Sequence, residues 1–481
     1  MNKFLIAFLG LAVSGCISLP VLRHAQPDLP SSWPTATAPS ERVPGLVRWW
    51  TLYDDPVLTA LIDEALAHNG DLLVAAARIE EARSALNLSD ADLQPYAQIG
   101  ANVGRNSITG VGSPPMPAGT QLTNNDFKLN LQASYEFDLW GRYHQASAAA
   151  RADLLASEYA REVVRTSLAG TVAQAYFQIA ALDARLLLTL ETLANRKEAV
   201  DLYRTRFNAG LDSELPWRQA EAELAAVDTT QADLERQMRQ QENALALLLG
   251  RSARELMESR PGRGKPLDGL SLPPAIPVGL PSDLLTRRPD IRQAEQRLAG
   301  AEARVLETRA AIYPTLSLTA NLGTESRALA DLFSGPAAIW GLGASLVQTV
   351  YNAGRTEAAL KGDAARQEQA LLVYEQTLRI AFKEVLDALV AVRQTRAAEA
   401  AEGRRAEALA RGAELADLRY RSGVSNYLEV LDAQRMLYQS RQNRIEDRRA
   451  QLAAAASLFK ALGGGWPPRP ETSPPGGHGS R

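Results

Sequence analysis

The sequence contains little of the chemistry on which most enzymes and small secreted proteins depend. Its 481 residues include one cysteine, so no disulfide can form within the chain and packing must hold the fold together. The four histidines are scattered, and none has an acidic residue or a cysteine at the spacing of a metal site or a catalytic triad. We therefore expect no enzyme activity, no metal site and no bound cofactor.

Strong charge and long apolar runs are also missing. The formal net charge of −3 leaves no large basic patch, so nucleic acid is not an expected partner. No run of about 20 apolar residues follows the N-terminal region, so the sequence predicts no transmembrane helix in the mature chain. Alanine, leucine, arginine, glutamate and glutamine dominate long stretches instead, which is typical of extended helices.

The N-terminal segment has the pattern of an export signal. Lys3 precedes a short apolar stretch at 4–13, and this stretch leads to Gly15-Cys16. The ending resembles a bacterial lipobox, where a peptidase cuts before a lipidated cysteine. We therefore expect residues 1–15 to be a lipoprotein signal peptide and Cys16 to carry N-palmitoyl and S-diacylglycerol lipid. Because Ile17 follows instead of an aspartate, the outer membrane is favoured over retention at the inner membrane.

The dominant pattern is a strand–helix block that occurs twice. Residues 127–138 alternate between apolar and polar side chains, which is typical of a strand with one apolar and one polar face. A long proline-free stretch follows and ends near Gly210, and the same order recurs from 339 to Gly423, 213 positions after Gly210. A membrane-length strand that leads twice into a helix about 100 Å long is not the plan of an ordinary soluble enzyme.

The repeat and the proline-rich segments divide the chain. We expect a lipidated tether at 16–48, a first repeat at 49–259, a linker at 260–281, a second repeat at 282–462 and a flexible tail at 463–481. The first repeat holds a helix from about 56 to 91, strands 97–105 and 127–138, and helices 142–207 and 213–250. The second repeat holds helix 289–312, strands 315–323 and 339–350, and helices 355–421 and 425–461.

The strand lengths predict a membrane-spanning sheet that needs more than one chain. Strands of this length cross the hydrocarbon core when tilted, but four strands cannot close a barrel and open edges cannot face lipid. Two chains would supply eight strands and three would supply twelve, and the polar face favours three because it suits a wet lumen. The alternatives are a soluble sandwich for the strands and a coiled coil for the helices. Small residues on all sides of helix 142–207 favour a wall of helices over a two-stranded coil.

Several motifs together resemble the TolC family of outer-membrane efflux ducts, in its lipoprotein branch that serves resistance-nodulation-division (RND) pumps. They are Trp49-Trp50, Asp55-Pro56, the strand exit 137–142, Arg287-Arg288-Pro289-Asp290-Ile291, Tyr313-Pro314, Asn352-Ala353-Gly354-Arg355 and the stretch 419–423. The resemblance implies an α+β membrane protein: a trimeric, 12-stranded transmembrane β-barrel, four strands per chain, continuous with a long periplasmic α-helical barrel. It also implies a periplasmic adaptor and an inner-membrane RND pump as partners.

The resemblance assigns roles to the residues around the two helical turns. Glu429 and Asp432 are three residues apart and share one helix face, where family members carry a pair of aspartates at the closed entrance. Tyr420 matches a tyrosine of the family's gate. The first repeat has Pro216 and Gln219 at the positions of the acid pair, so its part of the gate departs from the family pattern. The turn residues Gly210, Leu211, Gly423 and Val424 are expected to contact the adaptor.

The sequence thus predicts a passive exit duct that conducts drugs or other small molecules across the outer membrane. Two alternatives stay open. One is the outer-membrane duct of type I protein secretion, which the lipobox disfavours. The other is a periplasmic adaptor or coiled-coil lipoprotein, which would fractionate with the inner membrane.

Overall fold

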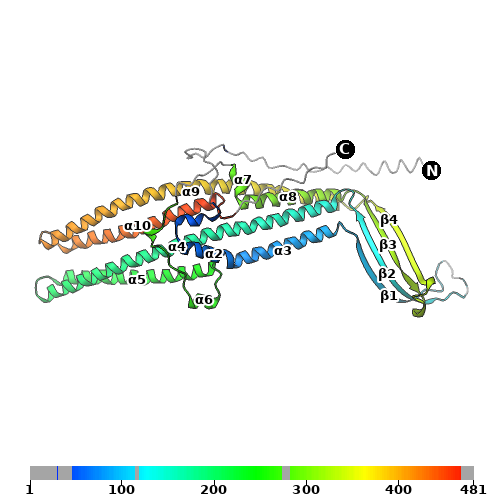
Figure 1. Cartoon of the computed structure of the whole chain (residues 1–481), viewed down its shortest axis with the longest axis horizontal. Coiled ribbons are helices and arrows are strands. Elements are labelled where there is room, and N and C mark those ends of the chain that lie inside the picture. The colour runs from blue at the N-terminus through cyan, green and yellow to red at the C-terminus, as the bar shows by residue number, and fades with distance from the viewer. Residues whose placement is uncertain (1–29, 31–45, 114–116, 118, 274–281, 467–481) are drawn as a thin grey trace. The chain divides into compact units, whose positions relative to one another are not determined.

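A computed structural model describes residues 30, 46–113, 117, 119–273 and 282–466. The signal peptide, Cys16 and nearly all of the expected tether lie outside these residues. The described chain forms two compact units, which we treat separately (Figure 1). The first unit contains Ile79–Ser157 and Ala294–Tyr374, and the second contains the described parts of Pro27–Arg78, Glu158–Gln293 and Glu375–Arg481. Each unit therefore takes a portion of both sequence repeats.

The helices follow the expected order closely. The long ones are α2 (Pro56–His68), α3 (Gly70–Ala91), α4 (Arg142–Asn208), α5 (Glu214–Leu248), α8 (Pro289–Ala310), α9 (Arg355–Arg421) and α10 (Tyr427–Ala461). Short helices are η1 (Leu46–Tyr53), α6 (Ala253–Glu258), η2 (Leu267–Gly269), α7 (Asp283–Arg287), η3 (Leu329–Asp331) and η4 (Gly335–Ala337). Within the described residues, none of these helices combines the length and the apolar character that a membrane span requires.

The first unit contains one antiparallel sheet in the order β1 (Tyr96–Ser107), β2 (Thr123–Phe137), β3 (Thr315–Ser326) and β4 (Ala338–Val347). Its register separates two faces. One row across the sheet aligns Gln98, Gln132, Asn321 and Gly341, and the next row, on the opposite face, aligns Ile99, Leu131, Leu322 and Trp340. We call these the polar face and the apolar face. The alternation expected for residues 127–138 is therefore confirmed and extends over all four strands.

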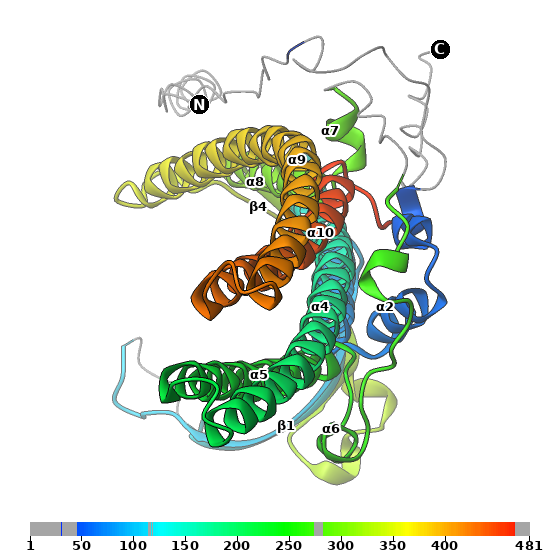
Figure 2. The same ribbon diagram turned by 90° about the vertical axis from the view of Figure 1, so that its left-hand side faces the viewer.

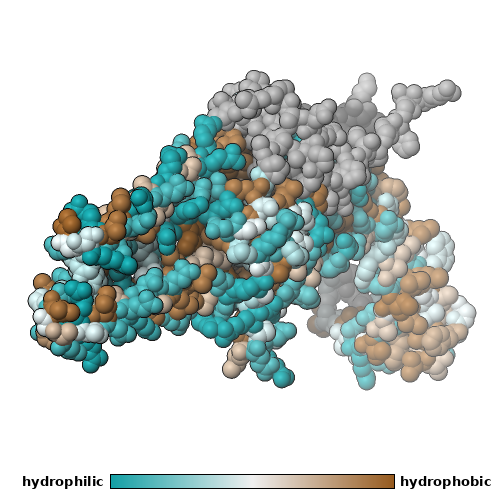
Figure 3. Space-filling model, turned by 60° about the vertical axis from the view of Figure 1, so that its left-hand side comes forward, coloured by the Kyte–Doolittle hydropathy of each residue, from teal (hydrophilic) through white to brown (hydrophobic). Residues whose placement is uncertain are grey.

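The apolar face of the sheet is bare in the single chain. Ile99, Leu322 and Trp340 are each more than 60% exposed. Figure 3 shows apolar side chains gathered over the strands. A contiguous apolar surface of this kind on a folded chain indicates contact with lipid or with another protein.

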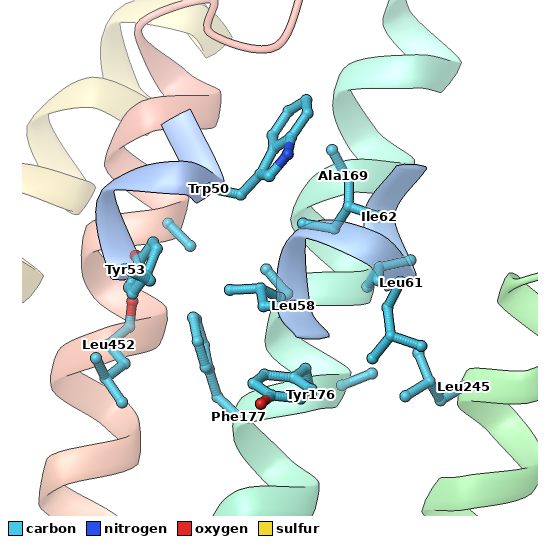
Figure 4. Close-up of a cluster of buried hydrophobic side chains, with 14 of the residues drawn as sticks. Trp50, Tyr53, Leu58, Leu61, Ile62, Ala169, Tyr176, Phe177, Leu245 and Leu452 are labelled. Carbon is cyan, nitrogen blue, oxygen red and sulfur yellow. The ribbon is translucent and has the colours of Figure 1, made fainter. Parts of the chain in front are cut away.

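The second unit has a core of aromatic and aliphatic side chains around η1, α2, α4 and α10 (Figure 4). Trp49, Trp50 and Tyr53 of η1 are fully buried or nearly so, and the Tyr53 hydroxyl donates to the Leu452 carbonyl at 3.0 Å. Asp55 is buried beside this core and begins α2, because its carboxylate accepts from the backbone N–H groups of Val57 and Leu58.

Three expectations need correction. The helix expected at about 56–91 is broken at Asn69, whose side chain accepts from the Asp71 N–H and starts α3, while its amide donates to Leu248. The expected linker 260–281 is partly packed, since Leu267 and Leu270 are buried. The expected tail begins too early, because residues 463–466 are buried and the Trp466 indole donates to the Arg287 carbonyl. Each error comes from a partner that is distant in sequence.

Candidate functional site

Two tight turns end the long helices at the same end of the second unit (Figure 2). In the turn between α4 and α5, Gly210 has φ +73°, and the N–H groups of Gly210 and Leu211 donate to the Phe207 and Arg206 carbonyls. In the turn between α9 and α10, Gly423 has φ +72°, and the N–H groups of Gly423 and Val424 donate to Tyr420 and Arg419. Both turns are Schellman motifs, and the positive φ explains why each has glycine at this position.

Each turn exposes a pair of aliphatic side chains. Leu211 and Leu215 are 69% and 63% exposed, and Val424 and Leu428 are 69% and 52% exposed. The residue after the glycine of a Schellman motif commonly packs back onto its own helix. Here Leu211 and Val424 extend into solvent instead, so the two turns offer matching apolar contact points to another molecule.

A cluster of three tyrosines joins the helices at the second turn. The ring centroids of Tyr203 and Tyr427 are 4.2 Å apart, and Tyr420 lies 6.2 Å from Tyr203 and 5.9 Å from Tyr427. These residues come from α4, α10 and α9, and burial raises the pKa of Tyr203 far above its ordinary value. The gate residue expected at Tyr420 is therefore part of an aromatic contact between the two helical hairpins.

The acid pair lies on α10, immediately after this turn. Glu429 is in the first turn of α10, where its N–H donates to the Asn426 side chain. Its carboxylate pairs with Arg419 at 3.1 Å, whereas Asp432 is exposed beside Arg435. Both acids are thus solvent-accessible, as a ring of charge would require. The pairing with Arg419 neutralises part of that charge.

Several polar contacts join the hairpins, and the two nearest the turns were not foreseen from the sequence. Arg435 of α10 forms an ion pair with Glu223 of α5, and the Arg435 guanidinium holds the pKa of Glu223 below its usual value. Arg196 of α4 donates to Gln434 of α10. Glu223 and Arg435 are 212 positions apart, and only the near-constant offset between the repeats could have suggested that their helices meet.

The first turn is built differently. Arg206 pairs with Asp212 at 2.5 Å, and Phe207 stacks on Trp217 with centroids 5.5 Å apart. Asp212 therefore bridges back to α4, and Ser213 is the N-cap of α5 without a side-chain hydrogen bond. Pro216 and Gln219 occupy the first turns of α5, so this turn has no counterpart of the acid pair.

The described residues contain no group of three or more histidine, cysteine, aspartate or glutamate side chains placed to hold a metal ion. The expected absence of a metal, of a cofactor and of catalysis stays a prediction. The same holds for the lipid on Cys16 and for the gate and adaptor roles.

Comparison with known proteins places the chain in a family. The sequence model described as outer membrane efflux protein matches residues 61–251 and 280–464. The pyoverdine export outer membrane protein OpmQ of Pseudomonas putida is 35% identical over 439 residues, which are 91% of this chain and 92% of OpmQ. The cation efflux system protein CusC of Escherichia coli is 33% identical over 476 residues, which are 96% of this chain and 99% of CusC.

Solved structures agree with this placement. A membrane protein from Pseudomonas aeruginosa matches with a TM-score of 0.83 and 33% identity, over 94% of this chain and 98% of that chain. The outer-membrane channel OprN matches with a TM-score of 0.83 and 29% identity, over 94% of this chain and the whole of OprN (100%). These likenesses confirm the expected fold class, the outer-membrane location and the function as an exit duct, and a periplasmic adaptor does not fit them. The chain belongs to the outer membrane efflux protein family and is an outer-membrane efflux channel.

Proposed function

We propose that three copies of this chain form the exit duct of a tripartite pump, together with a periplasmic adaptor and an inner-membrane RND pump. The observation that carries the proposal is the two-faced sheet of four strands, whose edge strands β1 and β4 each pair with one neighbour only among the described residues. An unpaired backbone edge in the hydrocarbon core costs several kcal/mol per polar group, so the edges must be paired between copies.

The number of copies follows from the width of the lumen. Two copies give eight strands, a barrel whose interior side chains fill, while three give twelve and leave an aqueous channel. Only the larger barrel has room for solutes beside the polar side chains of β1 to β4. The polar face therefore supports three copies over two.

The pump and the adaptor are inferred from the exposed side chains at the two turns and from the names of the relatives. OpmQ and CusC are named for export of pyoverdine and for cation efflux. Those names support small solutes as cargo and disfavour the alternative of type I protein secretion. The exposed pairs Leu211–Leu215 and Val424–Leu428 are suitable contact points for an adaptor, because removing exposed aliphatic side chains from water is favourable by roughly 25 cal/mol per Å² of buried area.

A competition experiment tests the partners. The purified protein would be offered adaptors of an RND pump and of an ABC-type secretion system from the same cell. We expect capture of the RND adaptor, with loss of capture when Leu211 and Val424 are both changed to Asp. Capture of only the secretion adaptor would contradict the proposal. The matched control is Met257→Asp, a change at an exposed apolar residue on α6, away from both turns.

A further inference from the structure

The polar face of the sheet carries few charged side chains, and one of them is a base among acids. The register places Asp126, Lys128 and Glu136 of β2 and Glu325 of β3 on this face. Lys128 is the only base on the polar face of the four described strands. It is directly opposite Glu325 in the register, and their charged atoms are 3.3 Å apart.

Glu136 lies at the end of the polar face nearest the helices, and its charge is also compensated. Glu136 accepts from Arg142 at 2.8 Å and from the Tyr143 hydroxyl at 3.1 Å. Neutral side chains and glycines occupy the rows between Glu136 and Lys128, among them the row of Gln98, Gln132 and Asn321. Without Lys128, the section of the polar face toward the connecting loops would carry Asp126 and Glu325 alone, and it would be purely anionic.

We propose that Lys128 sets the charge selectivity of the membrane section of the duct, by neutralising Glu325 and so weakening the preference for cations that Asp126 and Glu325 would impose together. This inference rests on the proposed trimer, in which the polar face lines the lumen. Rings of like charge in a pore select ions of the opposite sign. The charged atoms of Lys128 and Glu325 are only 3.3 Å apart, so a solute that lies farther away than this but within the Debye length of about 8 Å meets little net charge. At the same distance, either partner alone would act as a charge.

The same register supplies a control residue for Lys128 that lies on the apolar face of the sheet. Arg105 of β1 is near the same end of the sheet, but it is aligned with Asn125 and belongs to the apolar face. A solute in the lumen would not meet Arg105. Removal of its charge therefore separates an effect of net charge on the sheet from an effect of charge on the polar face.

The test is the reversal potential of the purified trimer in planar bilayers under a KCl gradient. All variants would carry Glu429→Ala and Asp432→Ala, so that the turn acids do not act as a second filter in series. We expect Lys128→Gln to raise the K⁺ over Cl⁻ permeability ratio severalfold and Glu325→Gln to lower it. The double variant K128Q/E325Q should return toward the background value, and Arg105→Gln should leave the value unchanged.

The outcomes separate this inference from the proposed function. If channels form but neither Lys128→Gln nor Glu325→Gln shifts the reversal potential, the role of Lys128 is wrong while the duct stands. The same conclusion follows if Arg105→Gln shifts the potential as much as Lys128→Gln. If the background protein forms no channel in any bilayer, the proposed trimeric duct itself fails.

Discussion

Asp55 anchors the segment after α6 to the core of the second unit, and its removal gives the sharpest stability prediction. Besides capping α2, its carboxylate accepts from the Tyr176 hydroxyl at 2.6 Å and from the Lys265 N–H at 3.0 Å. Asp55 and Tyr176 are each 2% exposed. The Asp55 side chain therefore holds three elements together: α2, α4 and the segment around Lys265.

The cost of Asp55→Ala can be worked out from these contacts. Loss of the cap costs about 1 kcal/mol. The Tyr176 hydroxyl and the Lys265 N–H would be left without a partner, at about 1–3 kcal/mol each. The sum is about 3–7 kcal/mol per chain, which is large for a single substitution. Tyr176→Phe removes one donor and leaves the rest of the site intact, so it should cost only about 1 kcal/mol.

Trypsin sensitivity and thermal melting measure this effect. Release of the segment would expose the Arg263–Gly264 bond to trypsin, whereas Lys265 precedes Pro266 and is not a trypsin site. We expect faster cleavage there and a lower melting temperature for Asp55→Ala at a fixed scan rate, since oligomers of this kind unfold irreversibly. Asp54→Asn is the matched control, because Asp54 is exposed and forms only a surface ion pair with Lys265. Equal trypsin resistance of Asp55→Ala and the unmodified protein would refute the reasoning.

Three further predictions concern the turns and the helices. Gly423→Trp should abolish adaptor capture while the trimer still assembles, and unchanged capture and drug resistance would contradict the role of this turn. Replacement of both Glu429 and Asp432 by alanine should raise a low single-channel conductance in planar bilayers, whereas a large conductance of the unmodified protein would exclude a closed gate. Burial, together with Glu402, Glu446 and Glu399, raises the pKa of Asp447. The folded-state pKa of Asp447 is above the unfolded value of about 3.9. The protonated Asp447 side chain therefore stabilises the folded state fully when the pH is below about 3.9, and this stabilisation is lost as the pH rises through the folded-state pKa. Asp447→Asn should therefore melt at a higher temperature than the unmodified protein at pH near 7, with a gap that shrinks as the pH falls toward about 4, and a gap independent of pH would contradict it.

The strands and the helix ends could be predicted because their signals are local. The alternation at 127–138 belongs to one strand and its two faces, and Gly210 and Gly423 end helices through their own backbone geometry. The expected helix 355–421 agrees at both ends with α9. Period and turn chemistry are properties of short segments, so a single sequence contains them.

The contacts that join distant segments could not be predicted in the same way. The ion pair of Glu223 with Arg435 depends on where two hairpins meet, and burial of Trp466 depends on the Arg287 carbonyl. The break at Asn69 likewise depends on Leu248. Each of these contacts can be seen only in the packed structure. The family resemblance pointed to Tyr420 and the acid pair, but it did not say which residues they contact.

The most direct test of the account is a disulfide ladder across the edges of the sheet. In the proposed trimer, β1 of one copy pairs with β4 of the next, and three copies close the ring. Ala101→Cys on β1 would be combined in turn with cysteine at Trp340, Leu342 or Ala344 on the same face of β4. After oxidation of outer membranes, we predict a ladder of one, two and three chains that stops at three for at least one pair, with no trimer band from any single-cysteine variant. A ladder that stops at two, or continues beyond three, or appears for none of the pairs, would contradict the trimeric duct.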